Sequence, residues 1–252
     1  MLKLYIGNKN YSSWSLRPWL LMTQFSIPFE EVQLRLSWNP ESDFKRTLRP
    51  INPAGRVPVL VHDGFAIWET PAIIEYLAES HPEHPIWPHA RRDRARARSL
   101  CAEMHAGFGA LRSAFPMNVE ASLPQVAAHC LQETPAVGAD LLRLEQMWGA
   151  QLEASGGPFL FGGFSAADAY FAPVCSRLET YQPPLSLPTT EAYASAVLGL
   201  PSMQAWCAAA RAEHTFVPED EPYRAEPVRE DTLRFDDAAS VRSPPDSCPT
   251  SG

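Results

Sequence analysis

Residues 11–19, "YSSWSLRPW", contain the side chains of this chain that most readily suggest chemistry. Three serines and a tyrosine offer hydroxyl groups and an arginine offers a fixed positive charge, beside the expected start of a helix. Serine at a helix start is commonly a cap, whose oxygen accepts a backbone N–H. A hydroxyl at the positive end of a helix can also stabilise an anion. The segment therefore raises the question of which serine caps the helix and which is free.

Pro18 limits where this helix can begin. A proline in a helix interior clashes with the carbonyl four residues earlier, which here belongs to Trp14. We therefore expect the helix to begin near Trp14 or Ser15, with Ser15 as the N-cap. This leaves Ser12 and Ser13 in the loop just before the helix.

The elements around this segment can be assigned in order along the chain. Residues 2–7 read as a short buried strand, and apolar residues at helical spacing follow from Leu16. Alternating apolar residues over 32–36 predict a second strand, so the first 36 residues read β-α-β. Residues 57–68 then predict a β-hairpin with an Asp-Gly turn, and a helix is expected to start at Thr70.

The rest of the chain is predicted to be helical. A proline- and histidine-rich stretch interrupts the periodicity and indicates a linker. The last part is charged and proline-rich, which is typical of an extended or disordered tail. We expect helices over 93–115, 123–154, 165–181 and 201–213. The predicted divisions are an α/β domain (1–80), a linker (81–92), an all-α domain (93–215) and a tail (216–252).

Composition excludes several classes of protein. The 252 residues carry a formal net charge of −8, which argues against nucleic acid as the main partner. No apolar run is long enough for a signal peptide or a membrane helix. The five cysteines are far apart and never in C-x-x-C spacing, so we expect reduced thiols in a cytoplasmic protein.

Four motifs together resemble the glutathione transferase family over residues 1–215. "SSWSLR" (12–17) is similar to the serine-and-arginine signature of zeta-like members, and "NPAGRVPVL" (52–60) to the segment around a cis-proline. "WET" (68–70) stands where the family has an acidic residue or glutamine followed by serine. "FSAADAYFAPV" (164–174) resembles the capping box of the second domain, which we interpret as structural. The resemblance implies a thioredoxin-like domain followed by a helical bundle, with glutathione as co-substrate.

The resemblance also implies a catalytic hydroxyl five positions before Arg17, which is Ser12. Ser12 is then expected to stabilise the glutathione thiolate, with Ser13 as the second choice. Tyr5 and Tyr11 are weaker alternatives, because other classes of the family use a tyrosine near the first strand. Arg17 is interpreted as structural or as a weak contributor to the field. Serine in place of the cysteine of omega-like relatives excludes a mixed disulfide at this position.

The glutathione-binding residues implied by the family lie in two further segments. A cis bond between Val57 and Pro58 would let the backbone of Val57 pair with the extended tripeptide. Glu69 would accept the ammonium group and Thr70, at a helix N-terminus, would hold the carboxylate of the γ-glutamyl end. Arg56 and Lys45 are candidates for the glycyl carboxylate, with Asp43 weaker.

The family places the second-substrate pocket along the first helix of the second domain. In this sequence the candidates are Met104, His105, Phe108 and Arg112, although apolar residues at this spacing also suit a plain core. His105 and Arg112 would meet a polar or anionic electrophile. The basic run at the start of this helix indicates a solvated face or a subunit interface, and a homodimer is expected from the resemblance.

The sequence therefore predicts a glutathione transferase that adds the thiolate to a small electrophile. A glutathione-dependent cis–trans isomerase remains open, because both reactions begin with the same thiolate. A non-catalytic binding protein of the same fold and a glutathione-dependent reductase or peroxidase also remain. No G-x-S-x-G, G-x-G-x-x-G or P-loop motif occurs, so hydrolase and nucleotide chemistry are not indicated. His81, His84 and His89 have ligand-like spacing, but no cysteine or carboxylate cluster is seen to complete a site, and we expect no metal.

Overall fold

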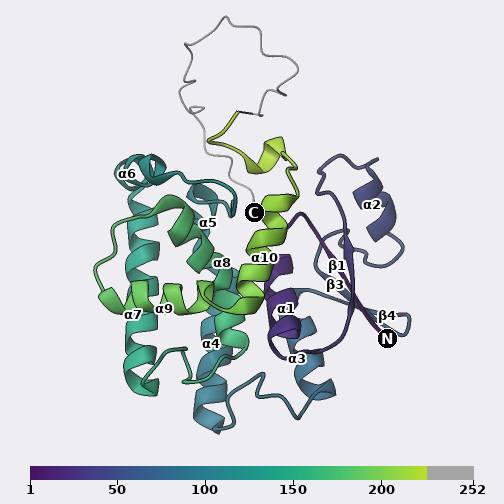
Figure 1. Ribbon diagram of the computed structural model, residues 1–252, viewed down its shortest axis with the longest axis horizontal. Helices are drawn as coiled ribbons and strands as arrows, with labels where there is room; N and C mark the ends of the chain where they lie inside the picture. The colour runs from purple at the N-terminus through teal and green to yellow at the C-terminus, as the bar shows by residue number, and fades with distance from the viewer. Residues whose placement is uncertain (226–252) are drawn as a thin grey trace, which may run out of the picture.

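The first part of the chain folds around a small mixed sheet. The computed structural model describes residues 1–225, shown in Figure 1. The strand order is β2-β1-β3-β4, with β1 parallel to β2 and antiparallel to β3, and with β3 antiparallel to β4. The strands are β1 (Leu2–Ile6), β2 (Glu30–Gln33), β3 (Val59–His62) and β4 (Phe65–Trp68).

Three helices belong to this part: α1 (Ser13–Gln24), α2 (Asp43–Leu48) and α3 (Thr70–Ser80). Alternate residues of β1 are buried against α1 and α3, and α1 also contacts α3. The predicted β-α-β followed by β-β-α order is confirmed. Two details differ. The second strand lies at Glu30–Gln33 rather than 32–36, and the stretch around Lys45, to which no element was assigned from the sequence, forms α2, whose N-cap is Ser42.

The second part is all helical, as expected. Its elements are α4 (Arg91–Ala106), α5 (Gly109–Ala114), α6 (Pro124–Glu133), α7 (Pro135–Ser155), α8 (Ala166–Tyr181), α9 (Pro188–Leu198) and α10 (Pro201–Ala212). The run expected over 93–115 breaks at Phe108, which adopts a left-handed conformation with φ 57°. The run over 123–154 breaks before Pro135, since a proline disfavours helical geometry in the residue before it. Helix α9 was not predicted.

Helix α8 is the centre of the second part. Nearly all of its residues are buried, and it contacts α1, α4, α6 and α9. The predicted capping box starts it: the Ser165 side chain accepts from the backbone and Asp168 accepts from the Ser165 N–H at 2.9 Å. Asp168 also accepts from the Tyr193 hydroxyl at 3.1 Å, which ties α8 to α9. Because α1 packs on α8, α8 holds the first part of the chain against the second.

The expected tail begins later than predicted. Residues 216–225 lie on the folded body: they include the short helix η1 (Pro218–Asp220), and the Tyr223 hydroxyl donates to the Ala114 carbonyl at 2.9 Å. The prediction of an extended or disordered tail is therefore wrong for 216–225, because buried Glu221 and half-buried Tyr223 supply anchors that composition alone does not reveal. Residues 226–252 lie outside the described part.

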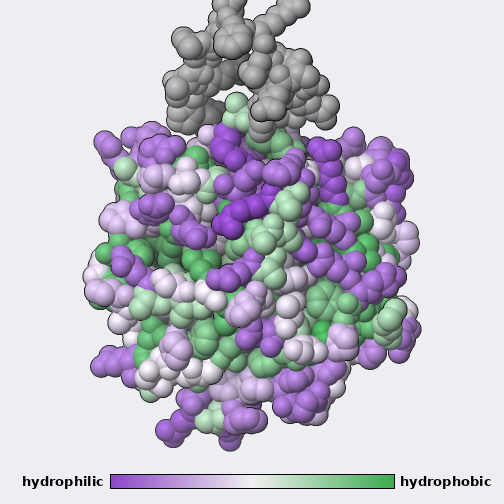
Figure 2. Space-filling view, viewed as in Figure 1, coloured by the Kyte–Doolittle hydropathy of each residue, from purple (hydrophilic) through white to green (hydrophobic). Residues whose placement is uncertain are grey.

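No helix among residues 1–225 has the length and hydropathy needed to cross a membrane. On the face drawn in Figure 2, hydrophilic side chains are interspersed with hydrophobic ones over both parts of the molecule. The four described cysteines, Cys101, Cys130, Cys175 and Cys207, are free and buried.

Candidate functional site

Two serine hydroxyls at the start of α1 are hydrogen-bonded to each other. Helix α1 begins at Ser13, and Ser12 occupies the N-cap position without a side-chain cap bond. The Ser12 hydroxyl donates to the Ser15 oxygen at 2.7 Å, and the same oxygen accepts the Gly7 N–H at 3.1 Å. The expectation that Ser15 is the N-cap was wrong, since the Leu16 N–H already donates to the Ser12 carbonyl and closes the first turn earlier.

Because α1 begins at Ser13, Pro18 lies in its second turn, and Arg17 stabilises the turn before it. Arg17 is almost fully buried and its guanidinium donates to the Ser13 carbonyl at 2.9 Å and to the Tyr170 carbonyl of α8 at 3.0 Å. The arginine thus stabilises the first turn of α1 and joins it to α8. Ser13 is more exposed than Ser12, which is 8% exposed.

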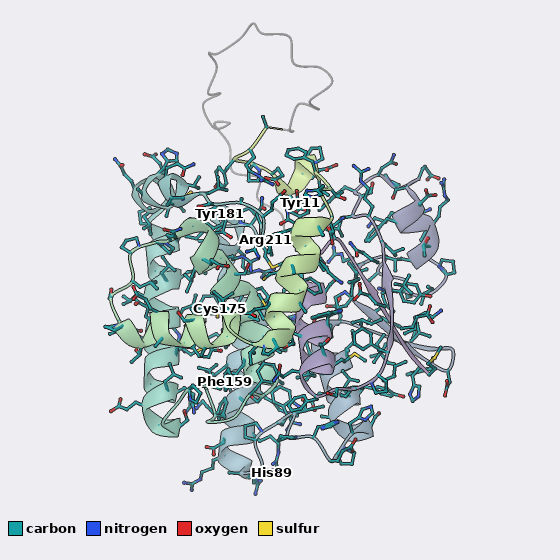
Figure 3. All side chains as sticks on the ribbon, viewed as in Figure 1. Tyr11, His89, Phe159, Cys175, Tyr181 and Arg211 are labelled. Atoms are coloured by element: carbon teal, nitrogen blue, oxygen red, sulfur yellow. The ribbon has the colours of Figure 1, made fainter. Side chains whose placement is uncertain are left out.

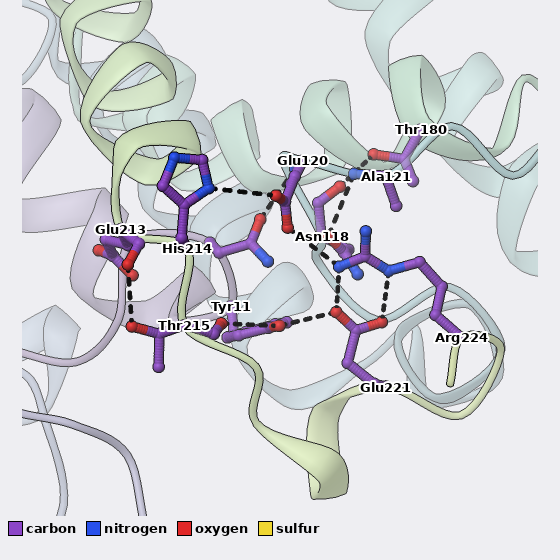
Figure 4. Close-up of polar contacts among 11 residues, drawn as sticks. Tyr11, Asn118, Glu120, Ala121, Thr180, Glu213, His214, Thr215, Glu221 and Arg224 are labelled. Carbon is purple, nitrogen blue, oxygen red and sulfur yellow. Dashed lines mark hydrogen bonds and ion pairs between the residues drawn. The ribbon is translucent and has the colours of Figure 1, made fainter. Parts of the chain in front are cut away.

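The two tyrosine alternatives lie in other surroundings. Tyr5 packs from β1 against the small cluster around α2. The Tyr11 hydroxyl donates to Glu221 at 2.7 Å, and Glu221 is also bound by Arg224, as Figure 4 shows. Burial, followed by the bond to Glu221, raises the pKa of Tyr11 to about 12. Tyr11 therefore anchors residues 213–225 and stays protonated at neutral pH.

The loop before β3 contains a cis peptide bond between Val57 and Pro58. Strand β3 begins at Val59, so the backbone of Val57 lies beyond the paired part of the sheet. Buried Asn52 holds the loop, because its side-chain amide donates to the Arg56 carbonyl and its oxygen accepts the Ala54 N–H, both at 2.9 Å. Asn52 was not singled out from the sequence, although it belongs to the "NPAGRVP" motif.

The turn into α3 contains two polar residues, Glu69 and Thr70, that are candidates for binding a ligand. Glu69 is exposed and has a φ of 69°, a conformation that is strained for a non-glycine residue. The Thr70 hydroxyl is buried and has no hydrogen-bond partner among the described residues. A buried hydroxyl without a partner costs about 1–3 kcal/mol, so this position fits a ligand that would accept or donate there.

Arg56 and Lys45 lie near the same loop. Arg56 is exposed, and its carbonyl is the group held by Asn52. The Lys45 ammonium, on α2, donates to the Gly55 carbonyl at 3.0 Å. Asp43 forms an ion pair with Arg46 on the outer side of α2. The structure therefore brings Lys45 to the cis-proline loop and leaves Asp43 at the surface.

The candidates on the second part divide into core and site. Met104 and Phe108 are buried in the main apolar core, at 0% and 5% exposure. His105 and Arg112 are half-buried and both contact Trp14: the His105 ring lies 4.9 Å from the indole centroid and the Arg112 guanidinium 5.1 Å. The Arg17 guanidinium stacks on the same indole at 3.9 Å. Trp14, which belongs to the serine motif and joins these three residues, was not singled out from the sequence.

Three arginines, on α1, α5 and α8, place positive charge where the first part of the chain meets the second. Within residues 1–225, Arg17, Arg112 and Arg177 form no ion pair with a carboxylate, and their hydrogen bonds go to backbone carbonyls. Burial, and then the charges of Arg177 and Arg112, lower the pKa of Arg17. Burial and the charge of Arg112 lower the pKa of Arg177 to about 10. Burial lowers the pKa of His105. The charge of Glu69 opposes this shift, and the charges of Arg17 and Arg112 add to it.

A hollow of about 550 Å³ lies elsewhere on the molecule. It is lined by Met1, Leu2, Glu30, His62 and His81, at the N-terminal end of β1. Ser12 follows the opposite end of that strand, so this hollow is separate from the serine site. Figure 3 shows Tyr11, one residue before Ser12, and His89, in the segment before α4, at opposite ends of the molecule.

Comparison with known proteins identifies similar chains. Residues 11–80 match the family model of the glutathione S-transferase N-terminal domain, and residues 91–209 match that of the C-terminal domain. The chain is 34% identical over 110 residues to a probable maleylacetoacetate isomerase of Caenorhabditis elegans, a match that covers 44% of this chain and 49% of that protein. It therefore spans about half the length of that relative.

Two further similarities cover more of the chain. The maleylacetoacetate isomerase of Rattus norvegicus is 27% identical over 207 residues, which is 80% of this chain and 89% of that protein. The crystal structure of a glutathione transferase homologue from Burkholderia with bound glutathione superposes with a TM-score of 0.64. It is 23% identical and covers 84% of this chain and 98% of that one, a likeness that concerns the fold.

Proposed function

Because the chain belongs to the glutathione transferase family, both of whose domains it contains, we propose that it stabilises a glutathione thiolate with Ser12 and adds it to a small electrophile. The observation that supports this most is the hydrogen-bonded pair of Ser12 and Ser15 at the start of α1. Glutathione supplies the thiol, and the thiolate is the nucleophile. Ser12 is the N-cap of α1, so its hydroxyl and the positive end of the helix would both stabilise the negative charge of the thiolate.

Ser15 makes Ser12 a better donor. Its oxygen already accepts the Gly7 N–H, so its own proton is free to point at Ser12. When the Ser12 proton turns toward an anion, the Ser15 proton replaces it in the 2.7 Å contact. The pair can therefore serve an anion without leaving either oxygen unsatisfied, and Ser15 acts as a positioning residue.

The energy available matches what the proposal requires. A free cysteine thiol has a pKa of about 8.5, and bringing it to about 7 requires about 2 kcal/mol. One hydroxyl that donates to a charged acceptor contributes about 1.5–3 kcal/mol. The positive end of α1 and the buried arginines add to this in the same direction.

The remaining groups suit the rest of the tripeptide. The Val57 backbone, which lies beyond the paired part of β3, would pair with the cysteinyl unit as an added strand does. Glu69 would accept the ammonium and the unpartnered Thr70 hydroxyl would donate to the carboxylate of the γ-glutamyl end. Lys45 and Arg56 would bind the glycyl carboxylate. Lys45 is held at the cis-proline loop by its bond to the Gly55 carbonyl, and Arg56 belongs to that loop.

The second substrate is proposed to be an organic acid. Arg112 is the half-buried member of three arginines that lack carboxylate partners within residues 1–225, and it lies against Trp14 beside His105. A carboxylate-bearing electrophile would compensate this positive charge. The same preference supports the alternative activity, a glutathione-dependent cis–trans isomerase, since the similar proteins of Caenorhabditis elegans and Rattus norvegicus are named maleylacetoacetate isomerases. Met104 and Phe108 would support the pocket from the core.

We also propose a cytoplasmic homodimer. The exposed aromatic side chains of Phe65 and Trp68 lie on β4, the last strand of the sheet order, and unpartnered apolar side chains on an edge suit a subunit contact.

Glutathione binding and turnover test the proposal separately. Calorimetry with glutathione is expected to show binding by the wild type and at least tenfold weaker binding by Glu69→Ala, since a lost charge-assisted bond costs about 1.5–3 kcal/mol. Turnover of a carboxylate-bearing electrophile then separates an enzyme from a binding protein. Glu79→Ala, on the exposed side of α3, is the matched control and should bind glutathione as the wild type does. Equal affinity of Glu69→Ala and the wild type would remove Glu69 from the site.

A further inference from the structure

A second cluster of potential ligands lies in the segment that joins the two parts of the chain. His81, Glu83 and His84, here called the linker cluster, each offer one ligand atom, and these atoms all lie within 4.8 Å of one another. The sequence shows the two histidines, but Glu83 lies between them, and sequence analysis did not count it as a ligand. His89, also in the linker, does not belong to the group.

The two histidine rings of the cluster converge on the Glu83 carboxylate. Glu83 Oε1 lies 3.3 Å from His81 Nδ1 and 3.7 Å from His84 Nε2. The His81 contact is a long hydrogen bond, and the 3.7 Å contact to His84 exceeds hydrogen-bond length. Zinc bonds of about 2.0–2.1 Å in tetrahedral geometry place neighbouring ligand atoms about 3.3–3.4 Å apart. The Glu83 oxygen therefore stands near tetrahedral spacing from both ring nitrogens, and the two imidazoles would turn toward each other to surround one ion, because the three atoms are spread over up to 4.8 Å.

The backbone around the cluster is fixed. Pro82 and Pro85 restrict the chain on either side of Glu83 and His84, and the His84 N–H donates to the His81 carbonyl at 3.1 Å. The His84 ring stacks on Phe25, with ring centroids 5.4 Å apart. A site held in this way loses less conformational entropy when an ion binds than a flexible one does.

The surroundings favour a cation and leave it a route to solvent. His81 is the C-cap of α3, and Phe25, under His84, is the C-cap of α1, so both helices direct their negative ends toward the cluster. The histidine side chains are 23% and 29% exposed, and Glu83 is 61% exposed. Two neutral imidazoles and one carboxylate bring a single negative charge to a divalent ion.

We propose that the linker cluster binds one borderline divalent cation such as Zn²⁺ through His81 Nδ1, Glu83 and His84 Nε2, with water in the open position. Two imidazoles and a carboxylate suit zinc, nickel or copper, whereas magnesium prefers oxygen ligands alone. The ion connects the C-terminal ends of α1 and α3 to the linker. Because these ends lie opposite the helix starts that hold Ser12 and Thr70, the ion takes no part in the serine site.

Zinc titration of the full chain tests the site. Calorimetry and thermal unfolding are expected to show one zinc per chain and a higher Tm with zinc, because a ligand of the folded state stabilises it. The double variant His81→Gln/His84→Gln should bind at least about 100-fold more weakly, since loss of an outer-sphere partner alone costs about 10–100-fold. Magnesium in place of zinc should leave the Tm unchanged.

His89→Gln is the matched control, because it removes a histidine of the same linker that lies outside the cluster. It should bind zinc with the affinity of the wild type. Glu83→Gln keeps both histidines and serves as the second variant if the double variant does not fold; it should bind at least tenfold more weakly. Unchanged zinc affinity in either cluster variant would overturn the proposal, as would a wild type that shows no zinc-dependent heat or Tm shift.

Discussion

The Ser12 hydroxyl donates to the Ser15 oxygen at 2.7 Å, while the Ser12 carbonyl accepts the Leu16 N–H in the first turn of α1. A serine that only capped the helix would accept from a backbone N–H, and Ser12 makes no such bond. Ser12 is thus available to a ligand, while Ser15 keeps it in place.

The first prediction concerns Ser12→Ala. Loss of the donated hydrogen bond, worth about 1.5–3 kcal/mol, should raise the pKa of the bound glutathione thiol by about 1–2 units. Turnover at neutral pH should fall about 10- to 100-fold, with glutathione affinity nearly unchanged. The ultraviolet absorbance of the thiolate, titrated against pH in the binary complex, measures the shift.

Tyr11→Phe provides the hydroxyl control for this experiment. The Tyr11 hydroxyl is adjacent in sequence but bonded to Glu221, so its removal should leave the pKa of the bound thiol where it is in the wild type. If Tyr11→Phe moved that pKa and Ser12→Ala did not, the tyrosine would be the catalytic hydroxyl. Ser13→Ala tests the second choice under the same conditions.

The second prediction concerns Ser15→Ala, which separates positioning from catalysis. The Gly7 N–H loses its partner in a buried place, so the free energy of unfolding should fall by about 1–3 kcal/mol. The pKa of the bound thiol should rise by less than in Ser12→Ala, because Ser12 itself remains. Chemical denaturation and the same thiolate titration give both numbers. A thiol pKa equal to that of the wild type would show that Ser15 has only a structural role.

The sequence predicted the order of elements well, because that order depends on local patterns. Alternation in the strands, the Asp-Gly turn and the Ser165–Asp168 capping box each involve residues close in the chain. Predictions that depended on where a helix tolerates proline were less accurate: Pro18 placed the start of α1 too late, since Arg17 and Leu16 stabilise an earlier turn through bonds to the Ser13 and Ser12 carbonyls.

Contacts between distant segments could not be predicted from the sequence. Trp14 and Arg17 are one helical turn apart, but nothing in local spacing brings His105 and Arg112 to the same indole. Buried Arg177 is likewise recognisable only once α8 is placed against α5. The anchor between Tyr11 and Glu221 joins residues 210 positions apart, which is why composition predicted a tail where 216–225 are packed.

The third prediction concerns the charge of the second substrate. Arg112→Gln should lower kcat/KM about 10- to 100-fold for an electrophile that bears a carboxylate, because a charge-assisted bond contributes about 1.5–3 kcal/mol. For an uncharged electrophile the change should stay within about twofold by the same reasoning. Steady-state kinetics with a matched acid and its methyl ester measure the difference. An equal loss with both substrates would show that Arg112 acts on the fold rather than on the acid.

The fourth prediction concerns the pH dependence of stability through Asp168. Burial raises the pKa of Asp168 to about 6, against hydrogen bonds from Leu160, Ser165 and Tyr193 that oppose the shift. In the unfolded chain the same carboxyl has a pKa of about 3.9. The folded state therefore binds more protons between these values. The stability contributed by this group is fully present below about pH 4 and is lost as the pH rises through 6, by about 2–3 kcal/mol.

Asp168→Asn removes the titrating group and isolates this effect. The variant should be less stable at every pH, since an amide cannot accept from all the donors that surround the carboxylate. Its disadvantage relative to the wild type should shrink as the pH rises from 4 to 6, because only the wild type loses stability there through this carboxyl. Urea denaturation at several pH values gives the difference, and a gap that widens over this range would contradict the raised pKa of Asp168.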